Sequence, residues 1–109
     1  MLYLTDGDID FYNGATVNGP SISANDWTHV AIVRDASSGI TMYVNGSSVA
    51  SGGAGNSPAN SGTLYIGYRG DAYHFDGMLD EVRIWNDVRT ATEISENYKS
   101  VLTGSEANL

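Results

Sequence analysis

The chain has no cysteine among its 109 residues, which excludes disulfide bonds, thiolate metal sites and cysteine nucleophiles. Basic residues are scarce as well, since 5 Lys and Arg stand against 13 Asp and Glu and leave a formal net charge of -8. A charge of this sign repels phosphate groups, so nucleic acid is not an expected partner. No apolar run reaches the roughly 20 residues of a membrane span, and residues 1–6 lack the basic and apolar regions of a signal peptide. We therefore expect no membrane insertion.

Proline is also rare, at 2 residues, whereas 13 Gly and 7 Tyr are typical of an all-β protein with many tight turns. Short apolar, β-branched and aromatic stretches recur between clusters of Gly, Asn, Asp and Ser, the spacing expected of a β-sandwich or barrel. The stretches that predict strands are residues 2–4, 9–12, 27–34, 40–44, 47–50, 63–68 and 78–85, with a short edge strand at 21–23. The chain length and the absence of a linker or repeat predict a single domain over residues 1–109.

The middle of the chain carries the clearest local signals. Residues 27–34 place apolar side chains on both faces, which predicts a central strand. Asn45 and Gly46 both tolerate positive φ, so they predict a tight hairpin turn between 40–44 and 47–50. Residues 51–61 are rich in Gly, Ser and Asn and predict a loop.

Toward the C-terminus, Thr90 followed by Glu93 forms a capping-box pattern, which predicts the start of a helix. Lys99 suits the C-terminal end of the helix dipole, and Gly104 suits the position just beyond that end. We expect a helix over residues 91–102 that packs one apolar face on the sandwich, the face formed by Ile94, Tyr98, Val101 and Leu102.

Several segments follow one another in a characteristic order: W-T-H-V-A-I-V-R-D, I-T-M-Y-V-N-G, T-L-Y-I-G and F-D-G-M-L-D-E-V-R-I-W-N. Together they resemble the C-terminal portion of the laminin G-like jelly roll domain in the concanavalin A-like lectin and glucanase superfamily. The resemblance implies an all-β fold, an antiparallel β-sandwich with one short C-terminal helix. It also implies an extracellular location, at a cell or virion surface.

Members of this family carry further strands before the stretch that corresponds to Tyr3 to Tyr12, so the chain is expected to lack the family's N-terminal strands. A sandwich without those strands would expose apolar surface or bare sheet edges, which monomers avoid. We therefore expect a homodimer or a place in a larger assembly, with strands supplied across the interface. The alternative is a minimal sandwich whose Asp-rich start covers the open edge.

Two groups of carboxylates are candidate metal ligands. The resemblance implies that Asp80, which leads D-E-V-R-I-W, binds a structural calcium ion, and the alternative is an Asp that caps a turn at an exposed strand start. Asp6, Asp8 and Asp10 do not match the calcium loop of an EF-hand, because the required Gly and Glu positions are occupied by other residues. They either hold a cation in another geometry or protect an edge strand by their charge.

The polar and aromatic segment between the last two predicted strands is the candidate ligand-binding loop. Aromatic rings stack on the apolar faces of sugars, and Asp and Arg side chains hydrogen-bond sugar hydroxyls. The alternative is an ordinary polar turn with locally packed tyrosines. The residues assigned to binding are Tyr68, Arg69, Asp71, Tyr73, His74 and Asp76.

These features predict a lectin-like module that binds a glycan or glycoprotein, with calcium as a candidate cofactor, and that is not an enzyme. The alternative is a structural, assembly or adhesion module that contacts other proteins. A glycoside hydrolase is the weakest alternative because E-x-D-x-x-E is absent, although Asp8 and Asp10 on one strand face would stand about 6.6 Å apart, a spacing that the geometry of inverting enzymes does not exclude. His29 is expected to be structural rather than a catalytic base.

Overall fold

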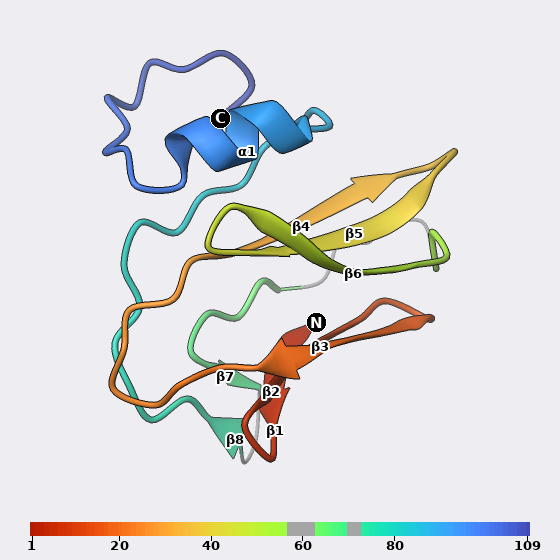
Figure 1. The fold of residues 1–109 in the computed structure, drawn as a ribbon, viewed down its shortest axis with the longest axis vertical. Coiled ribbons are helices and arrows are strands. Elements are labelled where there is room, and N and C mark those ends of the chain that lie inside the picture. The colour runs from red at the N-terminus through yellow and green to blue at the C-terminus, as the bar shows by residue number, and fades with distance from the viewer. Residues whose placement is uncertain (57–62, 70–72) are drawn as a thin grey trace.

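The computed structural model describes residues 1–56, 63–69 and 73–109 of the chain (Figure 1). Within these residues most of the regular structure is antiparallel β-sheet. The elements are β1 (Leu2–Thr5), β2 (Asp8–Tyr12), β3 (Thr16–Ser21), β4 (Val30–Asp35), β5 (Gly39–Val44), β6 (Ser47–Gly52), β7 (Tyr68–Arg69), β8 (Tyr73–His74) and α1 (Ala91–Asn97). None of the helical structure in the described residues is long and apolar enough to cross a membrane.

The first sheet is a meander with the strand order β1-β2-β3. Its first turn lies at Asp6 and Gly7, as predicted, and both residues have positive φ, 53° and 92°, which matches the twist of a tight hairpin. β3 was predicted only at its end, as an edge strand at 21–23, and the strand instead runs from Thr16 to Ser21.

A bulge in this sheet brings the backbone of β3 against the core. The pairing of β2 with β3 shifts register between Asp8 and Asp10, and the amide of Gly19 donates to Asp10 Oδ1 at 3.2 Å. A Cβ atom on Gly19 would lie 2.3 Å from the carbonyl oxygen of Ile9 and 2.4 Å from Sδ of Met42. The bulge therefore needs glycine at this position.

The second sheet has the order β4-β5-β6. The turn between β5 and β6 confirms the predicted hairpin, because Asn45 and Gly46 have φ values of 50° and 81°. The prediction for residues 27–34 is wrong in two respects. The strand begins at Val30, leaving Trp27 exposed, and β4 lies at the edge of its sheet, with β5 as its pairing partner in the described residues.

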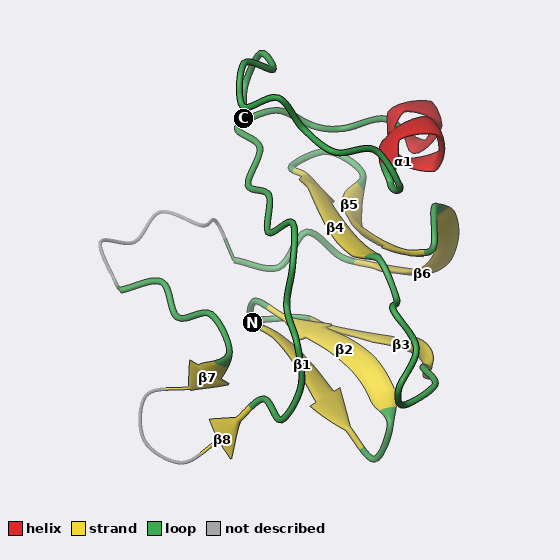
Figure 2. Ribbon diagram, turned by 90° about the vertical axis from the view of Figure 1, so that its left-hand side faces the viewer, coloured by secondary structure: helices red, strands yellow, loops and turns green. Residues whose placement is uncertain are grey.

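The two sheets face each other and enclose the core (Figures 1 and 2). Ile9 and Val17 come from the first sheet, and Ile40 and Met42, both fully buried, come from the second. Burial of one such side chain is worth about 1.5–3 kcal/mol, so this cluster stabilises the packing of the two layers. The predicted β-sandwich is confirmed.

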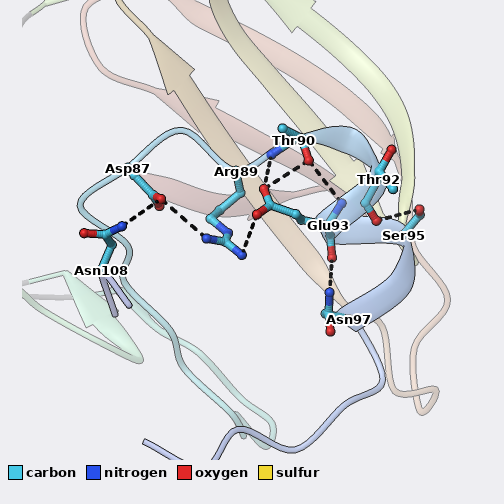
Figure 3. Close-up of polar contacts among 8 residues, drawn as sticks. All are labelled: Asp87, Arg89, Thr90, Thr92, Glu93, Ser95, Asn97 and Asn108. Carbon is cyan, nitrogen blue, oxygen red and sulfur yellow. Dashed lines mark hydrogen bonds and ion pairs between the residues drawn. The ribbon is translucent and has the colours of Figure 1, made fainter. Parts of the chain in front are cut away.

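Helix α1 starts as predicted. Thr90 caps it, and Glu93 completes the capping box by accepting from the backbone amide of Thr90 at 2.8 Å (Figure 3). Ile94 is buried against the sandwich, but the helix ends at Asn97 rather than at residue 102. Val101 is 79% exposed, so no apolar surface supports another helical turn there.

The two strands predicted nearest the C-terminus do not form as predicted. Residues 63–67 and 78–85 have no strand structure, and β7 begins only at Tyr68. Glu81 has a φ of 50°, which breaks the extended conformation of 78–85. A strand needs a neighbour for its backbone groups, and among the described residues no backbone hydrogen bond joins 78–85 to another segment.

Candidate ligand-binding site

A short hairpin carries most of the predicted binding residues. β7 pairs antiparallel with β8, so that Tyr68 lies opposite His74 and Arg69 opposite Tyr73. The amide of Phe75 donates to the carbonyl of Gly67 at 2.8 Å and closes the base of the hairpin. The predicted residue Asp71 lies outside the described residues. In both ribbon views the hairpin lies beside β1 rather than within either main sheet (Figures 1 and 2).

Two aromatic rings of this hairpin and one that precedes it make successive ring contacts and are called the aromatic platform: Tyr65, Tyr68 and His74. The ring of Tyr68 stacks on that of His74, with centroids 5.8 Å apart and an interplanar angle of 9°. Tyr65 meets Tyr68 edge to face at 5.0 Å. Tyr65 and Tyr68 are 48% and 43% exposed, so the rings support one another while remaining open to a ligand.

The neighbouring positions add further exposed groups. Tyr73 is 69% exposed and precedes His74 on β8, so side-chain alternation points it to the other face of the hairpin. Phe75 and Asp76 follow, and both are exposed. Tyr65 and Phe75 were not among the predicted binding residues. Tyr65 was assigned to the predicted strand 63–68, and only the structure shows the contact of its ring with that of Tyr68.

The candidate metal ligands do not converge. Asp8 and Asp10 accept hydrogen bonds from β3, Asp8 Oδ1 from the Ser21 hydroxyl and Asp10 Oδ1 from the Gly19 amide. Asp80 is exposed, and its Oδ1 accepts from the amide of Glu81 at 2.8 Å. Asp6 lies in the β1–β2 turn. Within the described ranges no three His, Asp or Glu side chains gather closely enough to hold a metal ion, and calcium binding stays a prediction.

His29 is half-buried beside the helix. Its ring lies 5.7 Å from that of Tyr98, and its buried Nδ1 has no hydrogen-bond partner within the described part of the chain. Burial, and to a smaller extent the positive charge of Arg83, lower the pKa of His29 below its ordinary value of 6.5. The ring of His29 packs against that of Tyr98, and its structural role stays a prediction.

Two facing antiparallel sheets, a tight central hairpin and one capped helix define the chain as a β-sandwich of the jelly-roll class. A laminin G family model described as the concanavalin A-like lectin/glucanases superfamily matches residues 2–95. The chain therefore belongs to this superfamily, and the resemblance drawn from its sequence is confirmed.

The chain is also similar to a solved structure, residues 221–444 of an S-layer domain-containing protein from Clostridium thermocellum ATCC 27405. The two share 26% sequence identity with a TM-score of 0.61, over 85% of this chain and 52% of the other. The chain thus spans about half the length of that structure. No protein with a curated description matches the chain.

Proposed function

We propose that the chain is a carbohydrate- or glycoprotein-binding module of a cell-surface protein and that the aromatic platform is its contact surface. The exposed contact of Tyr65, Tyr68 and His74 is the observation that carries this proposal. Membership in a superfamily of lectins and glucanases supports it. The cell-surface location is supported by the S-layer domain-containing neighbour.

The chemistry of the platform suits a sugar ring. The faces of aromatic rings are apolar and electron-rich, and they pack against the C–H groups on one side of a pyranose. Because Tyr68 is held between Tyr65 and His74, little side-chain freedom is lost when a ligand binds. Asp76, exposed two residues after His74, supplies carboxylate oxygens that accept hydrogen bonds from sugar hydroxyls. The proposal is one of binding, and no catalytic step is assigned.

The test is a glycan array with calcium present, followed by titration of the strongest ligands. Replacing Tyr68 with Ala removes the central ring, and contacts of this kind are worth about 0.5–1.5 kcal/mol beyond area burial, or roughly 2- to 13-fold in affinity. Tyr12→Ala is the matched control, because Tyr12 is 48% exposed on β2 and outside the platform. An array without ligands, or equal losses in both variants, would contradict the proposal.

A second candidate function is supported by exposed apolar residues in the segments 63–67 and 78–85. Six of them are between 53% and 74% exposed: Leu64, Ile66, Met78, Leu79, Val82 and Ile84. Solvated apolar patches of this kind mark interfaces, and they favour an assembly or adhesion module that a second copy or another surface protein covers. Light scattering tests this second function. We expect the parent protein to be a homodimer and Val82→Lys to be a monomer. A monomeric parent protein would instead favour the minimal sandwich.

A further inference from the structure

A groove of about 520 Å³ lies between the edge strand β4 and the segment 83–89 that precedes the helix. β4 contributes Ile32, Val33 and Arg34 to its wall, and the facing segment contributes Ile84 and Trp85, among others. Ligand sites in proteins are commonly about 300–1,000 Å³ in volume. Of the residues assigned to sugar binding or to calcium, those whose side chains the structure describes do not line this groove.

The described lining of the groove has more basic than acidic residues, unlike the protein as a whole. The whole chain carries 5 basic residues and a net charge of -8, yet Arg34, Arg83 and Arg89 all line this one groove. Asp87 is the acidic residue in the lining, and its carboxylate is already bonded by Arg89 at 3.4 Å and by the Asn108 amide at 3.1 Å (Figure 3). A concentration of cations on an acidic protein favours an anionic ligand.

The three arginines differ in which of their N–H donors are available to a ligand. Arg83 donates to the carbonyls of Asn97 and Ser100 and pairs with Glu81 at 3.1 Å. Its buried Nε has no partner in the ranges that the structure describes. Arg89 pairs with Asp87 and with Glu93, and these bonds hold it in place.

In the part of the chain that the structure describes, Arg34 keeps both terminal nitrogens of its guanidinium free at the groove. It donates through Nε to the Ala54 carbonyl at 2.9 Å, and among the described residues its two terminal nitrogens have no hydrogen-bond or ion-pair partner. A guanidinium anchored at Nε presents its remaining N–H groups as a fork, the geometry that binds a carboxylate through two bonds.

Trp85 adds a surface for a sugar ring. The guanidinium of Arg89 lies 4.3 Å from the centroid of the indole ring, covers one face of it and holds it in place, so the half-buried ring has its other face left for a ligand. Ile84 and Val88, 62% and 50% exposed, extend the apolar wall beside it. An aromatic ring, an apolar wall and a carboxylate-binding fork in one groove match a sugar that carries a carboxylate.

We propose that this groove binds a uronic acid residue of an acidic polysaccharide, with its carboxylate on Arg34 and its ring against Trp85. This inference rests on the proposed carbohydrate-binding function and adds a second contact surface of different chemistry. The aromatic platform, with the carboxylate of Asp76 close in sequence, suits neutral sugars, whereas the groove selects acidic ones.

The experiment measures binding of trigalacturonic acid by calorimetry, beside neutral galactotriose and a tri-aspartate peptide. Arg34→Gln removes the fork and its charge, so we expect about a tenfold loss of affinity for trigalacturonic acid. Lys99→Gln is the matched control: it removes one positive charge at a position outside the groove lining and should change affinity less than twofold. Arg34→Lys keeps the charge but not the fork and should fall between them.

Equal losses in Arg34→Gln and Lys99→Gln would overturn the proposal, because the binding would then be a general charge effect. Equal affinity for the aspartate peptide would also overturn it and would indicate a site for acidic protein segments. If the protein binds galactotriose through Tyr68 but does not bind trigalacturonic acid, the groove proposal is wrong and the proposed carbohydrate-binding function stands. If the protein binds no sugar, both the groove proposal and the proposed function are wrong.

Discussion

Replacing Gly19 with Ala tests whether the two sheets pack as closely as the structure indicates. The new Cβ would lie 2.3 Å from the carbonyl oxygen of Ile9, 2.4 Å from Sδ of Met42 and 3.1 Å from Cγ2 of Ile9. The φ of Gly19 is not positive, so alanine can adopt the backbone conformation. The destabilisation is therefore steric. It arises because the new Cβ clashes with a backbone carbonyl, which cannot move aside as a side chain can.

The magnitude follows from two opposing effects. Overpacking a core costs about 1–3 kcal/mol, and the clash with a backbone atom places Gly19→Ala at the upper end of that range. Alanine also restricts the unfolded chain, which returns about 0.4–1 kcal/mol. The net loss in the free energy of unfolding is then about 2 kcal/mol, which corresponds to a fall in Tm of roughly 10 °C for a domain of this size.

The assay is urea unfolding followed by circular dichroism, with Gly53→Ala as the matched control. A Cβ on Gly53 would meet nothing within 4 Å, so this variant should be neutral or slightly stabilised. In a double-mutant cycle with Met42→Ala, the loss from Gly19→Ala should be smaller once Met42 is truncated, because one of the two clashes is gone. A Gly19→Ala protein as stable as Gly53→Ala would refute the close approach of β3 to the core.

Four further predictions concern the helix cap, the pH dependence of stability at His29 and at Asp35, and calcium. Thr90→Ala removes the oxygen that accepts from the Glu93 amide at 3.2 Å and should cost about 1 kcal/mol of unfolding free energy, whereas Thr92→Ala in the same helix should not; equal Tm values would count against the cap. The lowered pKa of His29 means that the folded state binds fewer protons than the unfolded state. The free energy of unfolding should therefore be highest above pH 6.5 and decline as the pH falls below that value. His29→Gln should flatten this part of the plot of unfolding free energy against pH. The pKa of Asp35 is lowered from 3.8 to about 2 by hydrogen bonds from Ser37. The ionised carboxylate should therefore stabilise the fold fully above pH 3.8, and this stabilisation should disappear as the pH falls toward 2. Asp35→Asn should not show this loss of stability. Calcium at a hundredfold excess over Kd should raise the unfolding free energy by about 2.7 kcal/mol, and Asp80→Asn should abolish this gain; a Tm that is the same in calcium and in chelator would remove the predicted site.

The local features of the fold could be predicted because their causes are local. Asn45 and Gly46 have the positive φ values that a two-residue hairpin requires, and few other residue pairs adopt them. Thr90 and Glu93 satisfy each other's backbone amides within a single turn of chain. The family resemblance follows from the order of such segments, and the matching family model confirms it.

The candidate binding site was only partly predictable. The hairpin residues Tyr68 and His74 were selected for their chemistry, but their stacking depends on the antiparallel pairing of β7 with β8. The groove was not predicted at all, because Arg34 and Trp85 lie far apart in the sequence and are brought together by the packing of segment 83–89 near β4. Neither position carries a local signal for binding.

The sequence by itself determined the turns, the helix cap, the alternation of apolar residues and the family, because each depends on contacts between near neighbours or on the order of segments. The tertiary structure decided which strand-like segments became strands. Residues 78–85 have the composition of a strand but remain unpaired among the described residues, and β4 has the pattern of a central strand but lies at an edge. The physical reason is that a strand is stable only when a neighbouring strand hydrogen-bonds to its backbone and its apolar side chains are covered. Whether such a neighbour is present depends on how all the strands assemble.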